Sequence, residues 1–154
     1  MAIDLYWGSG SPFSWRVLLA LELKQLPYTS HLLQFSKQEH KSPQMLALNF
    51  RGRVPVLKDG DYVVFESLAV LFYLDRKYPD PPLFGRSPEE AGVIMRVICE
   101  YQAYTEQHLL TIANAFFTRP QEAPRADELS SAMHAVASEA RSTARPPAAL
   151  PADA

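Results

Sequence analysis

Two serines in the sequence stand at predicted helix starts, where an anion is favoured. Ser11 precedes Pro12, and Ser67 follows Glu66 at a strand-to-helix junction. The first turn of a helix carries unpaired N–H groups and the positive end of the helix dipole, and a serine hydroxyl adds another hydrogen-bond donor. These positions can therefore hold an anionic group. The alternative for each serine is a helix cap with no further role.

Local signals place both serines in an ordered series of short elements. Serine followed by proline, at Ser11 and again at Ser42, is typical of a helix start. Alternating apolar and polar residues indicate strands, and Asp59-Gly60 is typical of a hairpin turn. The predicted order is βαβ, a short helix, ββ and a helix. The strands are expected over 3–7, 28–33, 54–57 and 62–65, and the helices from Pro12 to before Pro27, from Pro43 to Leu48 and from Ser67 to Lys77.

Pro55 lies inside one of these predicted strands, where proline normally loses a ladder hydrogen bond. A proline in such a position suggests a special backbone geometry, and we expect a cis peptide between Val54 and Pro55. The alternative is a trans proline on an edge strand.

The composition excludes several classes of protein. The chain has 154 residues, a length typical of one domain. Its formal net charge is −2, which does not favour nucleic-acid binding. Its longest apolar run, 68–74, is too short to span a bilayer, and its N-terminus lacks the basic start of a signal peptide. One cysteine, Cys99, excludes an internal disulfide and is predicted to be a packed thiol. We expect a cytoplasmic protein with no nucleic-acid or membrane partner and no metal.

The second half of the chain changes in character. Residues 79–86 form a Pro- and Gly-containing linker, and Ser87-Pro88-Glu89-Glu90 opens a long helix predicted to end near residue 118. After Arg119 there is no aromatic residue, and Ala and Pro dominate. Such a segment buries too little apolar surface to offset the entropy of ordering it. Residues 120–154 are therefore predicted to be weakly ordered, with at most a weak helix over 126–141.

Four short motifs follow one another along the chain. They are Ser11-Pro12-Phe13-Ser14-Trp15-Arg16-Val17, His40-Lys41-Ser42, Asn49 with Gly52-Arg53-Val54-Pro55-Val56-Leu57, and Phe65-Glu66-Ser67. In this order and spacing they resemble the glutathione S-transferase family, in its serine-type (phi, tau, zeta and theta-like) branches. The resemblance covers residues 1–118 and implies a thioredoxin-like α/β domain over 1–78, the linker 79–86, and the start of an all-α domain over 87–119. Family members generally exceed 200 residues, so a C-terminally shortened member with an incomplete helical domain is expected.

The resemblance implies a catalytic role for Ser11, whose hydroxyl would stabilise the thiolate of glutathione; Ser9 and Ser14 are the competing hydroxyls. The other matching positions would bind the tripeptide. Ser67 would hold the γ-glutamyl carboxylate and Glu66 the γ-glutamyl ammonium, and Val54, beside Pro55, would pair with the cysteinyl backbone. His40 and Lys41 would hold the glycine carboxylate, with Arg53 reaching the same ligand; without the resemblance, the first two are a solvated charged loop.

The activity implied is that of a glutathione transferase, in which the thiolate of the co-substrate glutathione attacks a small-molecule electrophile. A homodimer is also implied. An isomerase acting on a maleylacetoacetate-type substrate is a close variant, because Ser14-Trp15-Arg16-Val17 also resembles the zeta branch. The alternative from another class is a non-catalytic thioredoxin-fold module that binds glutathione or another protein.

Overall fold

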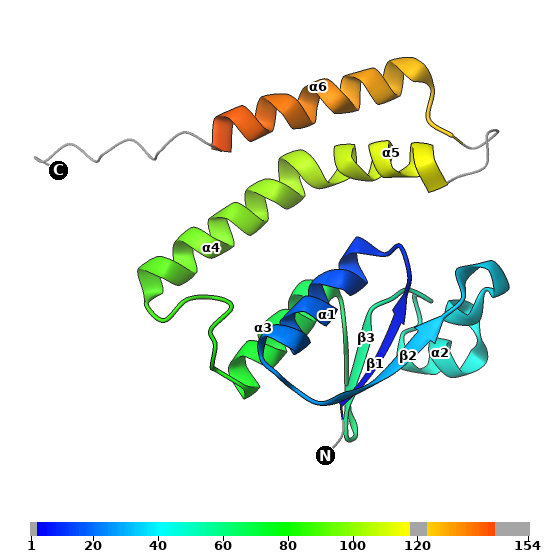
Figure 1. Ribbon diagram of the computed structural model, residues 1–154, viewed down its shortest axis with the longest axis vertical. Helices are drawn as coiled ribbons and strands as arrows, with labels where there is room; N and C mark the ends of the chain where they lie inside the picture. The colour runs from blue at the N-terminus through cyan, green and yellow to red at the C-terminus, as the bar shows by residue number, and fades with distance from the viewer. Residues whose placement is uncertain (1–2, 118–122, 144–154) are drawn as a thin grey trace, which may run out of the picture. The chain divides into compact units, whose positions relative to one another are not determined.

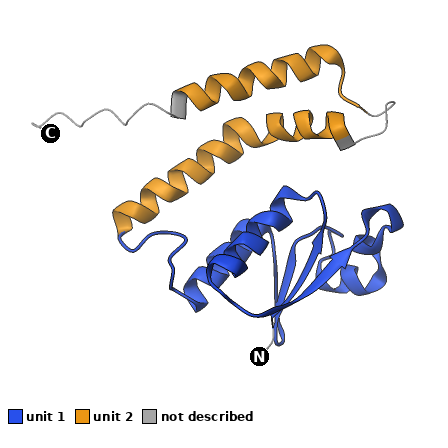
Figure 2. Cartoon of the chain, viewed as in Figure 1, with its two compact units in different colours: residues 1–87 blue, residues 88–154 orange. Residues whose placement is uncertain are grey.

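The computed structural model describes residues 3–117 and 123–143 of the chain. The chain divides into two compact units, Met1–Ser87 and Pro88–Ala154, which are coloured separately in Figure 2.

The first unit is built on a four-stranded mixed sheet in the order β2-β1-β3-β4 (Figure 1). The central strand β1 pairs in parallel with β2 and antiparallel with β3, and β3 pairs antiparallel with β4. The parallel pair requires a crossover, which a helix between β1 and β2 supplies. The strands are β1 (Ile3–Gly8), β2 (Tyr28–Leu33), β3 (Val56–Asp59) and β4 (Tyr62–Phe65).

Two of the three helices in this unit start at a capping serine followed by proline, as predicted. Ser11 Oγ accepts a hydrogen bond from the Ser14 N–H at 3.2 Å, and Ser42 Oγ accepts one from the Met45 N–H at 3.3 Å. Each cap satisfies one of the N–H groups that a helix start leaves unpaired. The helices are α1 (Pro12–Leu23), α2 (Pro43–Leu48) and α3 (Ser67–Lys77), with short 3-10 turns η1 (Phe35–Lys37) and η2 (Glu39–Lys41) before α2.

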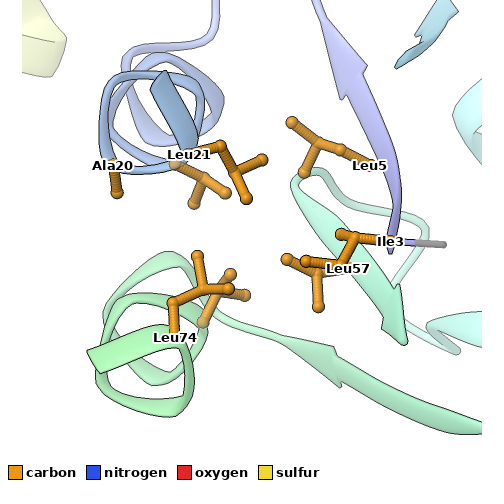
Figure 3. Packing of buried hydrophobic residues seen from close by; sticks show 8 residues of the cluster. Ile3, Leu5, Ala20, Leu21, Leu57 and Leu74 are labelled. Atoms are coloured by element: carbon orange, nitrogen blue, oxygen red, sulfur yellow. The ribbon is translucent and has the colours of Figure 1, made fainter. Parts of the chain in front are cut away.

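The core of this unit lies between the sheet and the pair α1 and α3, which contact each other. Figure 3 shows side chains from both helices and from β1 and β3 meeting in this layer. Leu21 is fully buried here, and its truncation to alanine would cost about 2–5 kcal/mol of stability. The buried cluster consists of Ile3, Leu5, Val17, Ala20, Leu21, Leu57, Val70 and Leu74.

A buried lysine ties the end of α1 to the segment after α3. Lys24 Nζ donates hydrogen bonds to the Asp75 carboxylate at 3.1 Å and to the carbonyls of Tyr78 and Pro81, both at 2.6 Å. Its side chain is fully buried, so these three acceptors compensate for the loss of water around the ammonium. The contacts fix both helices against each other at the edge of the core.

The observed order of elements confirms the predicted thioredoxin-like arrangement. One boundary differs: β3 begins at Val56, two residues later than predicted, so Pro55 lies before the ladder and its missing N–H costs no ladder bond. The Val54–Pro55 peptide is cis, as predicted, and Asp80–Pro81 is a second cis bond that the sequence did not indicate.

The second unit is helical, and the single long helix predicted from residue 87 is interrupted. A π-helical turn separates two α-helical segments, and a further helix packs against the second of them. Where composition predicted at most a weak helix over 126–141, the structure has an 18-residue helix; the remainder of that predicted tail, 120–122 and 144–154, lies outside the described residues. The elements are α4 (Pro88–Glu100), the π turn η3 (Tyr101–Thr105), α5 (Glu106–Phe117) and α6 (Ala126–Thr143).

One expectation for the second unit was wrong: Cys99 is exposed on α4 and is not a packed thiol. On the same helical run, Ile98 and Ile112 are half-buried, and Phe116 is 78% exposed. Across the described residues, no helix has both the length and the apolar character needed to cross a bilayer.

Candidate functional site

The register of the sheet gathers three chain segments at one end. Tyr6 of β1 is opposite Val56, so the last residues of β1 run alongside the segment that contains Val54 and Pro55. Val56 is also opposite Phe65, the last residue of β4. The turn after β1, the segment before β3 and the start of α3 therefore meet at the same sheet end.

A pocket of about 500 Å³ opens beside the first two of these segments. Five of the eight residues predicted to form a site line it, although they are distributed over more than forty positions of sequence. The charged side chains of its lining are basic, and no carboxylate is among its described lining residues, so the pocket favours an anionic ligand. The lining residues are Ser11, Phe13, Phe35, His40, Lys41, Arg51, Gly52, Arg53 and Val54.

The Ser11 hydroxyl is placed at this pocket by a turn at the end of β1. The Ser11 N–H donates to the Gly8 carbonyl at 3.2 Å, and Ser11 Oγ accepts from the Ser14 N–H. A serine oxygen that accepts one hydrogen bond still has its O–H proton to donate. The half-buried hydroxyl can therefore donate to an anion in the pocket while it caps α1.

The two competing serines have other surroundings. Ser14 is fully buried within the first turn of α1, and its Oγ has no hydrogen-bond partner among the described residues. Ser9 is exposed. Neither lines the pocket, which supports Ser11 as the hydroxyl in contact with a ligand.

His40 and Lys41 enter the pocket from the turn η2. Burial lowers the pKa of the His40 imidazole, and the positive charge of Lys41 lowers it further. His40 Nδ1 is buried and has no hydrogen-bond partner among the described residues. A buried polar atom without a partner is costly, and a ligand that reaches this atom would remove that cost.

Asn49 shapes the turn that carries the remaining basic residues. Its side-chain Nδ2 donates to the Arg53 carbonyl at 2.9 Å, and its Oδ1 accepts from the Arg51 N–H at 3.0 Å. Gly52, between the two arginines, has φ +58°, a conformation that most side chains disfavour. The turn thereby places Arg51, Arg53 and the backbone of Val54 at one pocket wall.

Sequence reasoning missed three side chains of this lining: Phe13, Phe35 and Arg51. Phe13 was within a quoted motif without a role, and Arg51 stands one residue from the glycine of another. The signal for Arg51 was its place two residues before Arg53 in a turn. Phe35 carried no local signal, because it comes to the pocket only through the fold.

Pro55, Glu66 and Ser67 are not among the lining residues of this pocket. Ser67 is the first residue of α3 and is buried, whereas Glu66 is exposed and precedes it with φ +68°. The Glu66 side chain makes no capping hydrogen bond, so the first N–H groups of α3 have no side-chain cap from it. The register places this helix start next to Val54 and Pro55, at the same sheet end.

Two larger cavities contain none of the predicted site residues. One, of about 860 Å³, lies between β2 and α2, and the other, of about 550 Å³, lies between α5 and α6. Size alone does not select the site, because neither cavity combines a helix-start hydroxyl with several cations. No group of three potential metal ligands occurs within residues 3–117 and 123–143.

Comparison with known proteins identifies the family of the chain segment that builds this pocket. The sequence model described as "Glutathione S-transferase, N-terminal domain" matches residues 10–77. Residues 10–77 of this chain belong to the N-terminal domain of the glutathione S-transferase family. A curated glutathione S-transferase A from Pleuronectes platessa is 48% identical over 77 residues, which are 49% of this chain and 34% of that protein.

Two further members of the family extend the comparison. A maleylacetoacetate isomerase from Pseudomonas aeruginosa is 39% identical over 105 residues, 64% of this chain and 50% of that protein. The crystal structure of a glutathione S-transferase from the Antarctic clam Laternula elliptica is 34% identical, with a TM-score of 0.75 over 92% of this chain and 64% of that one. The chain thus spans about a third to a half of the length of these curated relatives.

Proposed function

We propose that this chain binds glutathione in the pocket beside Ser11 and joins its thiolate sulfur to a small electrophile, so that the whole tripeptide is transferred. One observation carries the proposal: the Ser11 hydroxyl and the cations Lys41, Arg51 and Arg53 face the same cavity. Glutathione combines a thiol with two carboxylates, so it needs a donor for its sulfur and positive charge for its ends. The curated relatives that bear the name glutathione S-transferase support this choice of ligand.

Each end of the tripeptide has a place in this proposal. The γ-glutamyl carboxylate binds the N-terminus of α3 at Ser67, with Glu66 beside the γ-glutamyl ammonium. The cysteinyl backbone pairs with the Val54 N–H and C=O next to Pro55, as an added strand would. His40 and Lys41 bind the glycine carboxylate, and Arg53 adds a third basic group at the rim.

The chemistry needs no covalent bond to the protein. A free thiol has a pKa of roughly 8.5, so it reacts only after deprotonation. The Ser11 O–H and the N-terminus of α1 stabilise the thiolate, and its sulfur then attacks the electrophilic carbon. With an aryl halide, a C–S bond forms, the halide leaves with the bonding electrons, and the thiol proton goes to solvent.

A second candidate is isomerisation of a maleylacetoacetate-type substrate through a reversible glutathione adduct. The 39% identity to the Pseudomonas aeruginosa maleylacetoacetate isomerase favours it, as does the segment Ser14-Trp15-Arg16-Val17. Both activities use the same thiolate. For either, we propose a cytoplasmic homodimer, on the strength of the family resemblance alone.

The test is isothermal titration with glutathione together with a conjugation assay on a generic aryl halide. The proposal predicts binding of one glutathione per chain and turnover above the uncatalysed rate. Binding without turnover, on aryl halide and maleyl substrate alike, would instead indicate a non-catalytic module. Absence of both would reject the proposal.

A further inference from the structure

The ring of Phe35 occupies the space where a side chain at position 8 would lie. Gly8 is buried at the end of β1, and a Cβ built on it would come within 2.2 Å of Phe35 Cζ and 2.6 Å of Cε2. Real Cβ atoms essentially never approach other heavy atoms below 3.0 Å. The aromatic ring is therefore seated directly on the backbone of Gly8.

Conformation does not explain why position 8 is a glycine. The glycines with positive φ are Gly10, Gly52, Gly60 and Gly85, and Gly8 is not among them. As a strand residue paired with Leu33 of β2, it has a backbone that other residues adopt. The absence of a side chain at Gly8 thus leaves room in the structure, and the Phe35 ring fills that room.

The same ring contacts the other side of the pocket. The centroids of the Phe35 and His40 rings are 5.1 Å apart with an interplanar angle of 85°, an edge-to-face contact. Phe35 also lines the pocket itself. One side chain thus joins the end of β1, whose Gly8 carbonyl holds the Ser11 N–H, to the turn that carries His40.

We propose that Phe35 is a positioning residue that sets the separation between the Ser11 turn and His40, and that Gly8 provides the space for it. The inference rests on the proposed binding of glutathione, whose thiol and glycine carboxylate would reach these two places. Phe35 acts on the ligand through His40, because its ring has no polar atom to donate or accept.

A double-mutant cycle between positions 8 and 35 tests the steric part. Gly8→Ala is expected to weaken glutathione binding about tenfold, the factor that corresponds to one weakened hydrogen bond to a charged group. Phe35→Ala should weaken it by a similar factor. In the Phe35→Ala background the ring is gone, so adding Gly8→Ala should change the affinity by less than about twofold, a strong departure from additivity.

Gly92→Ala is the matched control, since a Cβ at this helical glycine of α4 meets no atom within 4 Å. It should leave glutathione affinity unchanged. Phe35→Leu protects the test against loss of folding, because it keeps an apolar side chain over Gly8 and should bind glutathione with an affinity between those of the parent and Phe35→Ala. Circular dichroism of each variant confirms that the comparison is made on folded protein.

A second ligand separates positioning from general damage to the structure. γ-Glutamylcysteine lacks the glycine carboxylate, so it gains nothing from a correctly placed His40. The parent chain should therefore prefer glutathione over γ-glutamylcysteine, and Phe35→Ala should remove most of that preference. If Phe35→Ala weakens both ligands by the same factor, or if Gly8→Ala costs as much without the ring as with it, the inference is wrong. If the parent chain binds neither ligand, the proposed function itself fails.

Discussion

Replacing Ser11 with alanine should affect the chain in two separable ways, on stability and on rate. Ser11 Oγ caps α1 by accepting the Ser14 N–H at 3.2 Å. Loss of a serine cap typically costs about 1 kcal/mol of stability. Loss of one preorganised donor to a reacting anion costs roughly 10²–10³ in rate. Ser11→Ala should therefore unfold slightly more easily and conjugate glutathione far more slowly.

Ser42 provides a matched control for the cap alone. It also precedes a proline, and its Oγ accepts from the Met45 N–H at 3.3 Å at the start of α2. Ser42→Ala should lose about the same 1 kcal/mol of stability. Because Ser42 does not line the pocket, its conjugation rate should stay within about threefold of the parent.

The assay is urea unfolding of both variants together with initial rates on an aryl halide at saturating glutathione. Ser11→Thr retains a hydroxyl at the same place and should recover part of the rate. Equal loss of rate in Ser11→Ala and Ser42→Ala would show that the effect comes from the caps. A parent-like rate in Ser11→Ala would refute the role of the hydroxyl.

Other contacts give further expected outcomes. Asn49→Ala removes the partners of the Arg51 N–H and the Arg53 carbonyl, so calorimetry should show weaker glutathione binding, by about tenfold; unchanged affinity would contradict the role of this turn. Lys24→Met leaves the Asp75 carboxylate without its cation and should cost about 3–5 kcal/mol in urea unfolding, whereas a loss below about 1 kcal/mol would show that the buried pair is dispensable. Burial alone would raise the pKa of Asp75, but hydrogen bonds from the Leu83 N–H and Lys24 outweigh it and hold that pKa below 3.8. Because the folded state then binds the proton less tightly than the unfolded state, the ionised Asp75 stabilises the fold fully above its ordinary pKa, and this stabilisation is lost as pH falls below it. Asp75→Asn should therefore flatten the acid limb of a stability–pH curve. Glutathione affinity should also fall as salt rises from low to physiological ionic strength, since the pocket rim is cationic and partly exposed; a salt-independent affinity would contradict an electrostatic contribution.

Local signals in the sequence predicted the helix starts that depend on interactions within one turn of the chain. The Ser-Pro pairs at Ser11 and Ser42 marked two helix starts, because capping and the fixed φ of proline act within one turn. The start of β3 was misplaced by two residues, since the apolar run from Val54 to Leu57 includes Pro55 although only Val56 begins the ladder. The order of elements followed from these signals, and the family resemblance supplied the fold.

Three other features were not predictable from these local signals. The π turn at Tyr101–Thr105 shifts the helical register within a continuous apolar pattern, which a helix-period count does not detect. The contact between Phe35 and Gly8 joins the turn after β2 to the end of β1, and no local spacing announces it. Arg51 reaches the pocket because Asn49 and Gly52 fold its turn. A tertiary contact thus places Phe35, whereas hydrogen bonds within its own turn place Arg51.

The most direct measurement of the central claim is a titration of the isotopically labelled chain with glutathione, followed by amide NMR. The account predicts saturable shifts that concentrate at Ser11, Lys41, Val54 and Ser67, which belong to four separate segments that the fold brings to one sheet end. No saturable shift, or shifts confined to the cavity between α5 and α6, would contradict it.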